Sequence, residues 1–291
     1  MRSPLVDPVV DWYRVNARTL PWRGPHVSAW AVLVSEIMLQ QTPAARVEPV
    51  FLTWMNRWPR PVDLAAEPAG EAVRMWAKLG YPRRALRLHE CARVIVERHG
   101  GDVPSDVETL LTLPGVGAYT ARAVAAFAFG RRQPVVDTNV RRVIARAVAG
   151  QAAAGPASTT RDLAAVEALL PGDEAEAAEF SIALMELGAL ICTARTPRCA
   201  ACPVPACAWL AAGSPAYDGP VTRPQRFAGT DRQVRGLLMD VLRASDGPVT
   251  SAELDVAWPD AVQRARALDG LVADGLIELA PGELFALPGQ T

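Results

Sequence analysis

The sequence predicts a mainly α-helical protein whose last part is a small module of helices and two strands. Apolar residues recur at helical spacing in nearly every long segment, and proline and glycine stand at the joins between segments. No run with the alternating pattern of a strand occurs before residue 275. A chain of 291 residues is long enough for two modest domains or three small ones.

The expected helices follow one another with short joins. Ser28 precedes an apolar segment as a helix cap would, and pairs such as Trp58-Pro59 and Pro171-Gly172 mark helix ends. Helical spacing covers residues 9–15, 28–41, 47–58, 71–79, 85–99, 106–111, 118–130, 138–148, 160–170 and 176–191.

The last part of the chain follows a stretch with the composition of a linker. Helical patterns cover 231–244, 251–257 and 259–273, and two short strands are expected on either side of Pro281-Gly282. Helices followed by a hairpin predict a winged-helix-like module.

Charge is unevenly distributed along the chain, although the net charge is only −1. Residues 226–291 hold six basic and ten acidic residues, a net of −4, so the first 225 residues sum to +3. Residues 116–149 contain six arginines and one acid, Asp137. Such a stretch either binds phosphates or covers solvated helix faces. Lys78 is the only lysine.

The composition also bears on location. No stretch approaches the ~20 uninterrupted apolar residues that a membrane span needs, and the first residues lack the apolar region of an export signal. These features predict a soluble cytoplasmic protein.

Four of the five cysteines fall in one window, with intervals of six, two and four residues. In a reducing compartment such a cluster favours a metal site over disulfides. A single Cys-x-x-Cys flanked by two lone cysteines resembles an iron-sulfur run more than a zinc site, which usually pairs two such motifs. The four are Cys192, Cys199, Cys202 and Cys207. Cys91, in a helical pattern, is expected to be a buried small apolar residue.

Two carboxylates are candidates for glycosidic chemistry. Glu36 lies in SAWAVLVSEIMLQQT on a mostly apolar helical stripe, where burial would raise its pKa and make it a general acid. The alternative is an exposed glutamate at the edge of a helix. Asp137 stands where a helix begins, as an N-cap that the helix dipole would keep ionised. One neutral and one ionised carboxyl suit cleavage through an oxocarbenium-like transition state.

The segment LLTLPGVGAYT, residues 110–120, predicts a helical hairpin. Gly115 and Gly117 remove side chains that would keep a phosphate from the backbone N–H groups of the turn and of the next helix. The alternative is a plain turn between helices.

Together these residues resemble a known family. LPGVG, a following VD and four cysteines near the end of the helical part are similar to the helix-hairpin-helix DNA glycosylases that carry a 4Fe-4S cluster. The match sharpens toward adenine DNA glycosylases of the MutY type. It rests on LPWR (20–23), SEIMLQQT (35–42), LGY (79–81), LPGVGAYTA (113–121), VDTNVRRV (136–143) and MELGALICT (185–193).

The resemblance implies a domain organisation. An N-terminal helix in residues 1–20 would pack with the cluster domain, and residues 21–132 would form a six-helix barrel that includes the helix-hairpin-helix 106–129. Residues 133–212 would form the iron-sulfur cluster domain, 213–225 a linker and 226–291 the winged-helix-like module, in place of a Nudix-like domain. The 66 residues that follow Gln225 are too few for that fold.

The same resemblance implies a base excision repair enzyme that flips out and removes adenine mispaired with 8-oxoguanine or guanine in double-stranded DNA. Glu36 would protonate the base and Asp137 stabilise the sugar cation, with Asn139 and Tyr119 orienting the site. Gln41 and Tyr81 would fill the gap and wedge beside the opposing base. The other DNA contacts would be Arg18, Leu20, Trp22, Arg23, Leu39, Gln40, Thr42, Gly115, Val116 and Gly117. Cys192, Cys199, Cys202 and Cys207 would hold one 4Fe-4S cluster.

The resemblance also implies a monofunctional enzyme, because Tyr119 stands where the endonuclease III type carries its Schiff-base lysine. A monomer at the nucleoid is expected. The alternatives are an endonuclease III-like or thymine/uracil mismatch glycosylase, and a non-catalytic helix-hairpin-helix DNA-binding protein with a structural metal.

Overall fold

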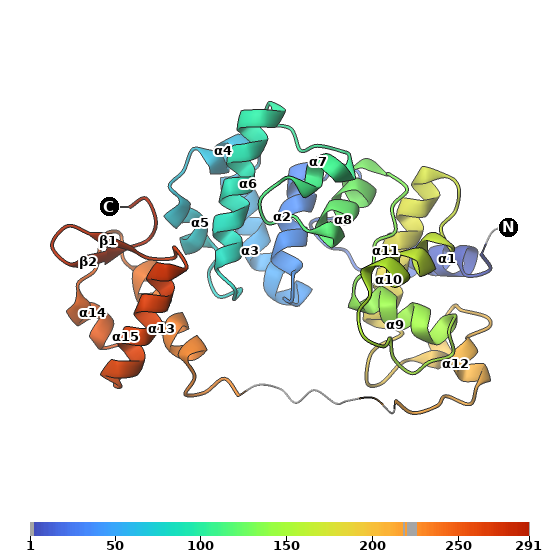
Figure 1. Cartoon of the computed structure of the whole chain (residues 1–291). Coiled ribbons are helices and arrows are strands. Elements are labelled where there is room, and N and C mark those ends of the chain that lie inside the picture. The colour runs from blue at the N-terminus through green and yellow to red at the C-terminus, as the bar shows by residue number, and fades with distance from the viewer. Residues whose placement is uncertain (1–2, 218, 220–225, 291) are drawn as a thin grey trace. The chain divides into compact units, whose positions relative to one another are not determined.

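The computed structural model describes residues 3–217, 219 and 226–290 (Figure 1). The mainly helical fold that the sequence predicts is confirmed, and two short strands follow the last helix. The elements are α1 (Val6–Asn16), α2 (Ala29–Leu39), α3 (Ala44–Arg57), α4 (Pro61–Ala65), α5 (Ala69–Met75), α6 (Arg83–His99), α7 (Val107–Leu111), α8 (Ala118–Phe129), α9 (Thr138–Ala147), α10 (Thr159–Glu167), α11 (Glu174–Leu190), a 3-10 turn (Cys199–Ala201), α12 (Ala208–Ala211), α13 (Asp231–Ala244), α14 (Ser251–Asp255), α15 (Ala261–Ala273), β1 (Glu278–Ala280) and β2 (Leu284–Ala286).

The observed helices differ from the expected ones mainly at their ends. The helices α4 and α12 were missed because one helical turn is too short to show a period. The helix expected over 28–41 ends at Leu39, and the one expected over 71–79 ends at Met75. In both cases a residue of left-handed backbone conformation follows, Gln41 at φ 57° and Ala77 at φ 48°.

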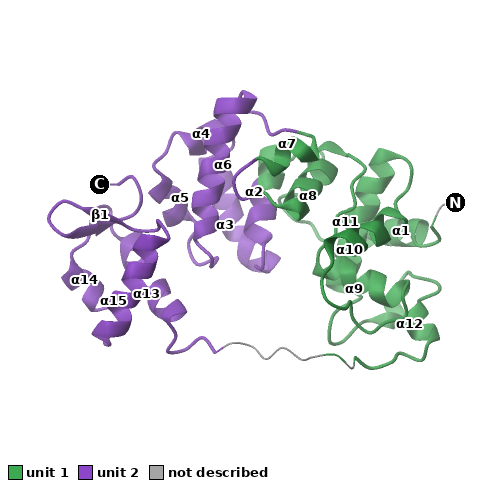
Figure 2. Cartoon of the chain, in the orientation of Figure 1, with its two compact units in different colours: residues 1–33, 105–112, 116–221 green, residues 34–104, 113–115, 222–291 purple. Residues whose placement is uncertain are grey.

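Packing divides the chain into two compact units (Figure 2). Unit 1 comprises residues 1–33, 105–112 and 116–221, and unit 2 comprises residues 34–104, 113–115 and 222–291. The expected barrel, 21–132, contributes to both units, and the C-terminal module belongs with residues 34–104. The expected domain limits stay a prediction, and residues 218 and 220–225 of the expected linker lie outside the described residues.

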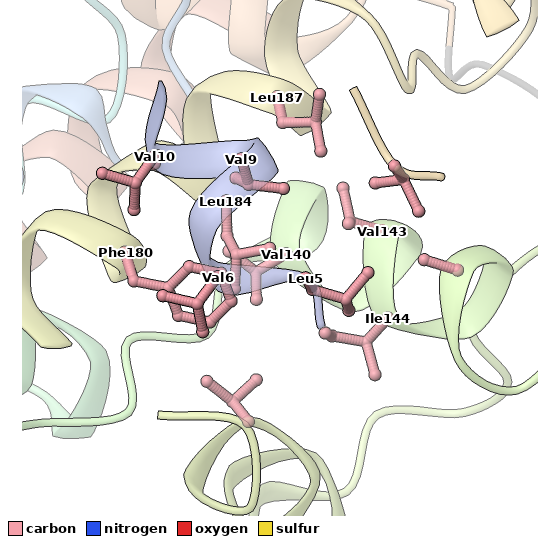
Figure 3. Close-up of a cluster of buried hydrophobic side chains, with 14 of the residues drawn as sticks. Leu5, Val6, Val9, Val10, Val140, Val143, Ile144, Phe180, Leu184 and Leu187 are labelled. Atoms are coloured by element: carbon pink, nitrogen blue, oxygen red, sulfur yellow. The ribbon is translucent and has the colours of Figure 1, made fainter. Parts of the chain in front are cut away.

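The core of unit 1 forms where α1, α9 and α11 meet (Figure 3). Val6 and Val9 of α1 pack with Val140 of α9 and with Phe180 and Leu184 of α11, and all five are at most 1 % exposed. Their burial fixes the start of α9, where Asp137 lies. Cys192, Cys202 and Cys207 pack against the edge of the same core.

The core of unit 2 contains three buried tryptophans. The ring of Trp54 meets those of Trp58 and Trp76 edge to face, with centroids 4.9 and 5.5 Å away. Each indole N–H has an acceptor, which a buried tryptophan requires: Trp54 donates to the Met75 carbonyl and Trp76 to the Gly80 carbonyl. The indole of Trp76 therefore fixes Gly80, in the segment that leads into α6, to the core of unit 2.

The C-terminal module has the order expected of a winged helix. Helices α13, α14 and α15 precede the antiparallel hairpin of β1 and β2, in which Leu279 pairs with Phe285. Val249, between α13 and α14, forms a further bridge to Phe285 that the sequence pattern did not reveal.

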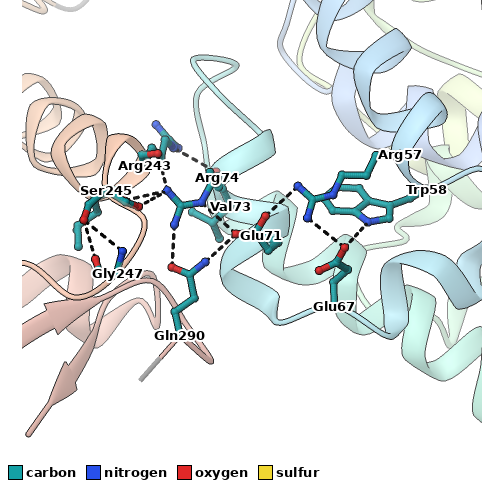
Figure 4. A network of polar contacts seen from close by, with 11 residues as sticks. Arg57, Trp58, Glu67, Glu71, Val73, Arg74, Arg243, Ser245, Gly247 and Gln290 are labelled. Carbon is teal, nitrogen blue, oxygen red and sulfur yellow. Dashed lines mark hydrogen bonds and ion pairs between the residues drawn. The ribbon is translucent and has the colours of Figure 1, made fainter.

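The module docks on α5 through a network of polar contacts (Figure 4). Arg74 donates to the carbonyls of Leu242 and Arg243, in the last turn of α13, and of Ser245, which caps that helix. The N–H of Gly70 donates to the Pro288 carbonyl at 2.7 Å. A Cβ at position 70 would lie 2.8 Å from that of Leu287, so only glycine allows this close approach. The acidic module therefore packs against α5 of the same unit.

In the part of the chain that the structure describes, none of the helices is long and apolar enough to cross a bilayer.

Candidate active site and DNA interface

Glu36 lies inside the apolar helix α2. The helix begins after Ser28, whose Oγ accepts the N–H of Ala31 at 3.1 Å, as the predicted cap requires. Glu36 is 5 % exposed, and its neighbours Val32 and Leu33 are also buried. The alternative of an exposed glutamate is therefore wrong. This burial is the condition for the predicted rise in its pKa.

Two loops of unit 2 expose the residues expected to enter the DNA. Leu39, the last residue of α2, and Gln40 are half-buried, whereas Gln41 is exposed and Thr42 is buried. Before α6, Tyr81 is 56 % exposed. Gln41 and Tyr81 both have left-handed backbone conformations, at φ 57° and 48°. Non-glycine residues adopt this conformation only when their surroundings impose it, and it is common at functional sites.

The hairpin between α7 and α8 has the predicted form. The Asp106 carboxylate accepts the N–H of Thr109 at 2.8 Å and caps α7. Gly115 has φ 80°, and a Cβ there would lie 2.9 Å from the Cβ of Arg87, so conformation and space both require glycine. Gly117 caps α8 and has open space around its Cα, while Val116 between the two is buried. Gly115 and Gly117 are both exposed, which leaves the backbone of the turn accessible as the predicted phosphate contact requires.

Asp137 is the N-cap of α9, as the sequence predicts. One carboxylate oxygen accepts the N–H of Val140 at 2.7 Å, and the other accepts the side-chain N–H of Asn139 at 2.6 Å. The Asn139 oxygen in turn accepts from Arg142 at 2.8 Å. Asn139 therefore orients Asp137, and Arg142 orients Asn139.

The pKa of Asp137 differs from the expectation. Burial raises the pKa of this carboxyl, and the hydrogen bonds from Val140 and Asn139 only partly offset the rise. The N-cap position predicts an ionised carboxyl. The opposing effect of burial could not be predicted, because the sequence does not show how far the surrounding helices exclude water from Asp137.

Arg142 connects this arrangement to the first cysteine of the cluster. Its Nε donates to the Cys192 carbonyl at 2.6 Å and its Nη2 to the Gly188 carbonyl at 2.7 Å. Gly188 lies on α11, where a Cβ would approach the Cβ of Asn139 to 2.7 Å. The sequence analysis assigned no site role to Arg142 or Gly188. A glycine inside a helix, which costs about 0.5–1 kcal/mol relative to alanine, is a signal of close packing that could have found Gly188.

Three of the four clustered cysteines, Cys192, Cys202 and Cys207, pack at the edge of the unit 1 core. Burial raises the pKa of the Cys202 thiol, and the charges of Cys192, Cys207 and Cys199 raise it further. Arg146 Nη1 donates to the Cys192 sulfur at 3.5 Å, and the Cys207 sulfur donates to the Arg146 carbonyl at 3.6 Å. Four reduced thiols that interact in this way fit a thiolate-bound group. Among the described residues, however, no three His, Cys, Asp or Glu side chains are grouped to hold a single metal ion.

Cys91 is the buried small apolar residue that the sequence predicts. It is 0 % exposed, and burial raises its pKa to about 12.

The LPWR segment makes its contacts inside the protein. Glu186 of α11 is completely buried, and its carboxylate accepts two bonds of 2.7 Å from Arg18 and faces Arg23 at 3.0 Å. Its pKa is lowered, because these arginines outweigh the large effect of burial. Leu20 and Trp22 are also buried. Of the four expected DNA contacts, Arg18 and Arg23 thus pair with Glu186, which the sequence reasoning missed, and Leu20 and Trp22 are buried.

Tyr119, near the start of α8, is half-buried and packs beside Val135. Its hydroxyl lies 4.0 Å from the Met185 sulfur, which comes from α11.

The arginines of residues 116–149 do not form a free phosphate-binding stripe. Each of the six donates to, or pairs with, a group of the same unit. Arg122 bonds Gln133, Arg131 pairs with Glu174, Arg132 bonds the Pro171 carbonyl, Arg141 pairs with Asp162, Arg142 bonds the Cys192 carbonyl and Arg146 bonds the Thr193 carbonyl.

Comparison with known proteins agrees with this arrangement. Residues 34–167 match the family described as HhH-GPD superfamily base excision DNA repair protein. The adenine DNA glycosylase of Mycobacterium tuberculosis is 61 % identical over 283 residues, which cover 97 % of this chain and 93 % of that protein. The adenine DNA glycosylase of Mycolicibacterium smegmatis is 60 % identical over 289 residues, which cover 98 % and 97 %.

A solved structure of a thermostable thymine-DNA glycosylase is also similar. It has a TM-score of 0.63 and 29 % identity, and the match covers 71 % of this chain and 95 % of that one. The identity with the two full-length relatives is far higher. The chain therefore belongs to the adenine DNA glycosylases of the HhH-GPD superfamily, base excision repair enzymes that hydrolyse an N-glycosyl bond in DNA.

Proposed function

We propose that this enzyme removes adenine mispaired with 8-oxoguanine or guanine, with Glu36 as the general acid. The observation that carries the proposal is a glutamate only 5 % exposed in α2, a helix that ends two residues before the exposed, left-handed Gln41. A carboxyl in such surroundings holds its proton near neutral pH. It protonates the adenine ring, so that the base leaves as a neutral molecule.

Asp137 stabilises the cationic sugar that remains. Its ionised form supplies the negative charge that an oxocarbenium-like transition state requires. Asn139 and Tyr119 orient the groups around it. Water then forms a bond to the sugar carbon and gives one proton to the Glu36 carboxylate, which lost its own proton to the base. Gln41 and Tyr81 occupy the space that the flipped adenosine leaves in the duplex, which offsets the unstacking cost of a few kcal/mol. The DNA substrate brings the enzyme to the nucleoid, where it acts as a monomer.

The enzyme releases the base and leaves the strand intact. Strand cleavage by β-elimination needs an amine nucleophile. The only lysine, Lys78, is paired with Asp240 at 3.3 Å, and position 119 is a tyrosine.

The decisive experiment is single-turnover base release from duplexes with adenine opposite 8-oxoguanine, adenine opposite guanine, and thymine opposite guanine. Glu36→Gln should lower adenine release by at least about a hundredfold, because an amide cannot donate the proton. Glu97→Gln, which changes an exposed glutamate of α6, is the matched control and should keep the wild-type rate. Full activity of Glu36→Gln would contradict the proposal. Release of thymine but not adenine would favour the mismatch-thymine activity of the structural relative.

Cys192, Cys199, Cys202 and Cys207 hold a 4Fe-4S cluster in this proposal. Their mutual interaction and their position against the core support a structural role. We expect four irons per chain and an absorbance band at about 400 nm. Removing the iron with a chelator should abolish this absorbance and lower the thermal stability of the protein. One zinc per chain without visible absorbance would contradict the cluster.

A further inference from the structure

The loops that carry Gln41 and Tyr81 meet at one side chain, Arg84 of α6. Its Nη1 donates to the carbonyls of Ile37, Met38 and Gln40 at 2.8, 3.0 and 2.7 Å. The last carbonyls of a helix have no partner within the helix, so Arg84 completes the end of α2, the helix that carries Glu36.

The other terminal nitrogen of Arg84 binds both loops. Nη2 donates to the hydroxyl oxygen of Thr42 at 3.1 Å and to the Gly80 carbonyl at 3.0 Å. Arg84 therefore bonds the residues on both sides of Gln41 and the residue directly before Tyr81. The Thr42 hydroxyl is the other group between the loops, since it donates to the Gln40 carbonyl at 3.3 Å.

The guanidinium is itself held in place by aromatic rings. Its carbon lies 5.2 Å from the Trp76 ring centroid and 5.6 Å from the Tyr81 ring centroid. Trp76 is fully buried and donates its indole N–H to the same Gly80 carbonyl at 3.0 Å. The Thr42 hydroxyl lies 3.5 Å from the Leu79 carbonyl, which closes the network between the loops.

We propose that Arg84 is a positioning residue that fixes Gln41 and Tyr81 relative to each other and to the helix of Glu36. The inference rests on the proposed function of these three residues. Two residues that enter a duplex together must be placed before the adenosine leaves the stack, since an error of about 1 Å costs on the order of a hundredfold in rate. Lysine cannot replace Arg84, because it offers a point charge with three donors instead of a planar fork with five.

The first test compares Arg84→Lys with Arg93→Lys, a matched change at an exposed arginine of the same helix that pairs with Glu97. Two substrates are used: adenine opposite 8-oxoguanine, and adenine opposite an abasic site, where less pairing opposes flipping. Arg84→Lys should slow release from the first duplex about a hundredfold and from the second less than about tenfold. Arg93→Lys should keep both rates.

A spectroscopic measurement follows the flipping step directly. With 2-aminopurine in place of adenine, the fluorescence of the duplex should rise on binding the wild-type enzyme and should rise much less with Arg84→Lys. If Arg84→Lys keeps the wild-type rates and fluorescence, or slows both substrates equally, Arg84 has no positioning role.

A second set of variants covers the case in which Arg84→Lys folds poorly. Thr42→Val removes one acceptor of Arg84 at nearly constant volume and should produce a smaller change in the same ratio of rates. In a Gln41→Ala, Tyr81→Ala background, adding Arg84→Lys should slow release by no more than about twofold, since residues that act through one another are not additive. A full additional loss there would overturn the inference.

These outcomes are separable from a failure of the proposed function. If Glu36→Gln is inactive while Arg84→Lys behaves as wild type, only the positioning role fails. If Glu36→Gln retains full activity, the proposed acid is wrong whatever Arg84 does.

Discussion

Asp137 shows how one residue carries a structural and a chemical role. As the cap of α9 it accepts the N–H of Val140, which an asparagine could also do. As a buried carboxylate it bears a charge that its surroundings disfavour, because burial raises its pKa more than its hydrogen bonds lower it. The proposed mechanism needs the charged form, so in it the folded enzyme keeps a group that does not favour its own stability.

Replacing Asp137 by asparagine should therefore separate activity from stability. A carboxyl whose pKa is raised on folding contributes stability below its unfolded pKa, and this contribution is lost as the pH rises through the folded pKa. We expect the Tm of the wild type relative to that of Asp137→Asn to fall as the pH rises from about 3 to about 7. Thermal melts over this range check the sign.

The activity of Asp137→Asn should fall by at least about a hundredfold at neutral pH. Asp173→Asn, which changes the cap of α11, is the matched control: its carboxylate accepts the N–H of Glu176 on the exposed surface. A pH dependence of the Tm difference with the opposite slope would show that the burial of Asp137 does not dominate.

At the scale of elements, the contact of α9 with α11 sets the geometry around Asp137. Gly188 allows the backbone of α11 to touch Asn139, and its carbonyl accepts from Arg142. Arg142 continues to the Cys192 carbonyl, where the cysteine window begins. A change in the spacing of the two helices is thus transmitted to Asp137 through Asn139.

Gly188→Ala should disrupt this contact, since the new methyl group would lie 2.7 Å from the Asn139 Cβ. Overpacking of this kind costs about 1–3 kcal/mol of unfolding free energy, and adenine release should fall with it. Gly236→Ala on α13 has nothing within 4 Å and should leave activity unchanged while stabilising the helix by about 0.5–1 kcal/mol. Urea unfolding and single-turnover assays compare the two, and equal stability of both variants would disprove the tight contact.

At the scale of the whole molecule, the acidic C-terminal module lies beside the loop of Tyr81. Asp240 pairs with Lys78 at 3.3 Å and Asp274 with Arg83 at 3.2 Å, on either side of Tyr81 in the sequence. These pairs are partly exposed, so they add little to stability. We therefore expect their carboxylates to compete with DNA phosphates for Lys78 and Arg83, the two cations that flank the proposed wedge.

Replacing both carboxylates, in Asp240→Asn with Asp274→Asn, should strengthen binding to undamaged DNA. Each cation released to a phosphate should steepen the dependence of log K on log salt concentration by about one unit. Asp269→Asn, on the exposed face of α15, changes the net charge without contacting Lys78 or Arg83 and serves as the control. Fluorescence anisotropy over a salt series measures the slopes, and identical slopes for all proteins would exclude the competition.

Local patterns in the sequence determine the helices of this protein, the hairpin and the burial of Glu36. Helical periodicity, the cap at Ser28 and the turn at Gly115 depend on residues close in the chain, so the helical fold and the hairpin could be predicted. The burial of Glu36 followed from the apolar stripe of its own helix. The spacing of the four cysteines was sufficient to predict a metal site.

Only the tertiary structure decided which charged side chains are used inside the protein. Arg18 and Arg23 meet a glutamate more than 160 residues away, and the arginine-rich stretch binds carbonyls and carboxylates of its own unit. Nothing local separates Arg84, which joins two loops, from its neighbour Arg83. The pKa of Asp137 likewise depends on water excluded by distant helices. Long-range contacts and desolvation set these properties, and neither has a periodic signal in the sequence.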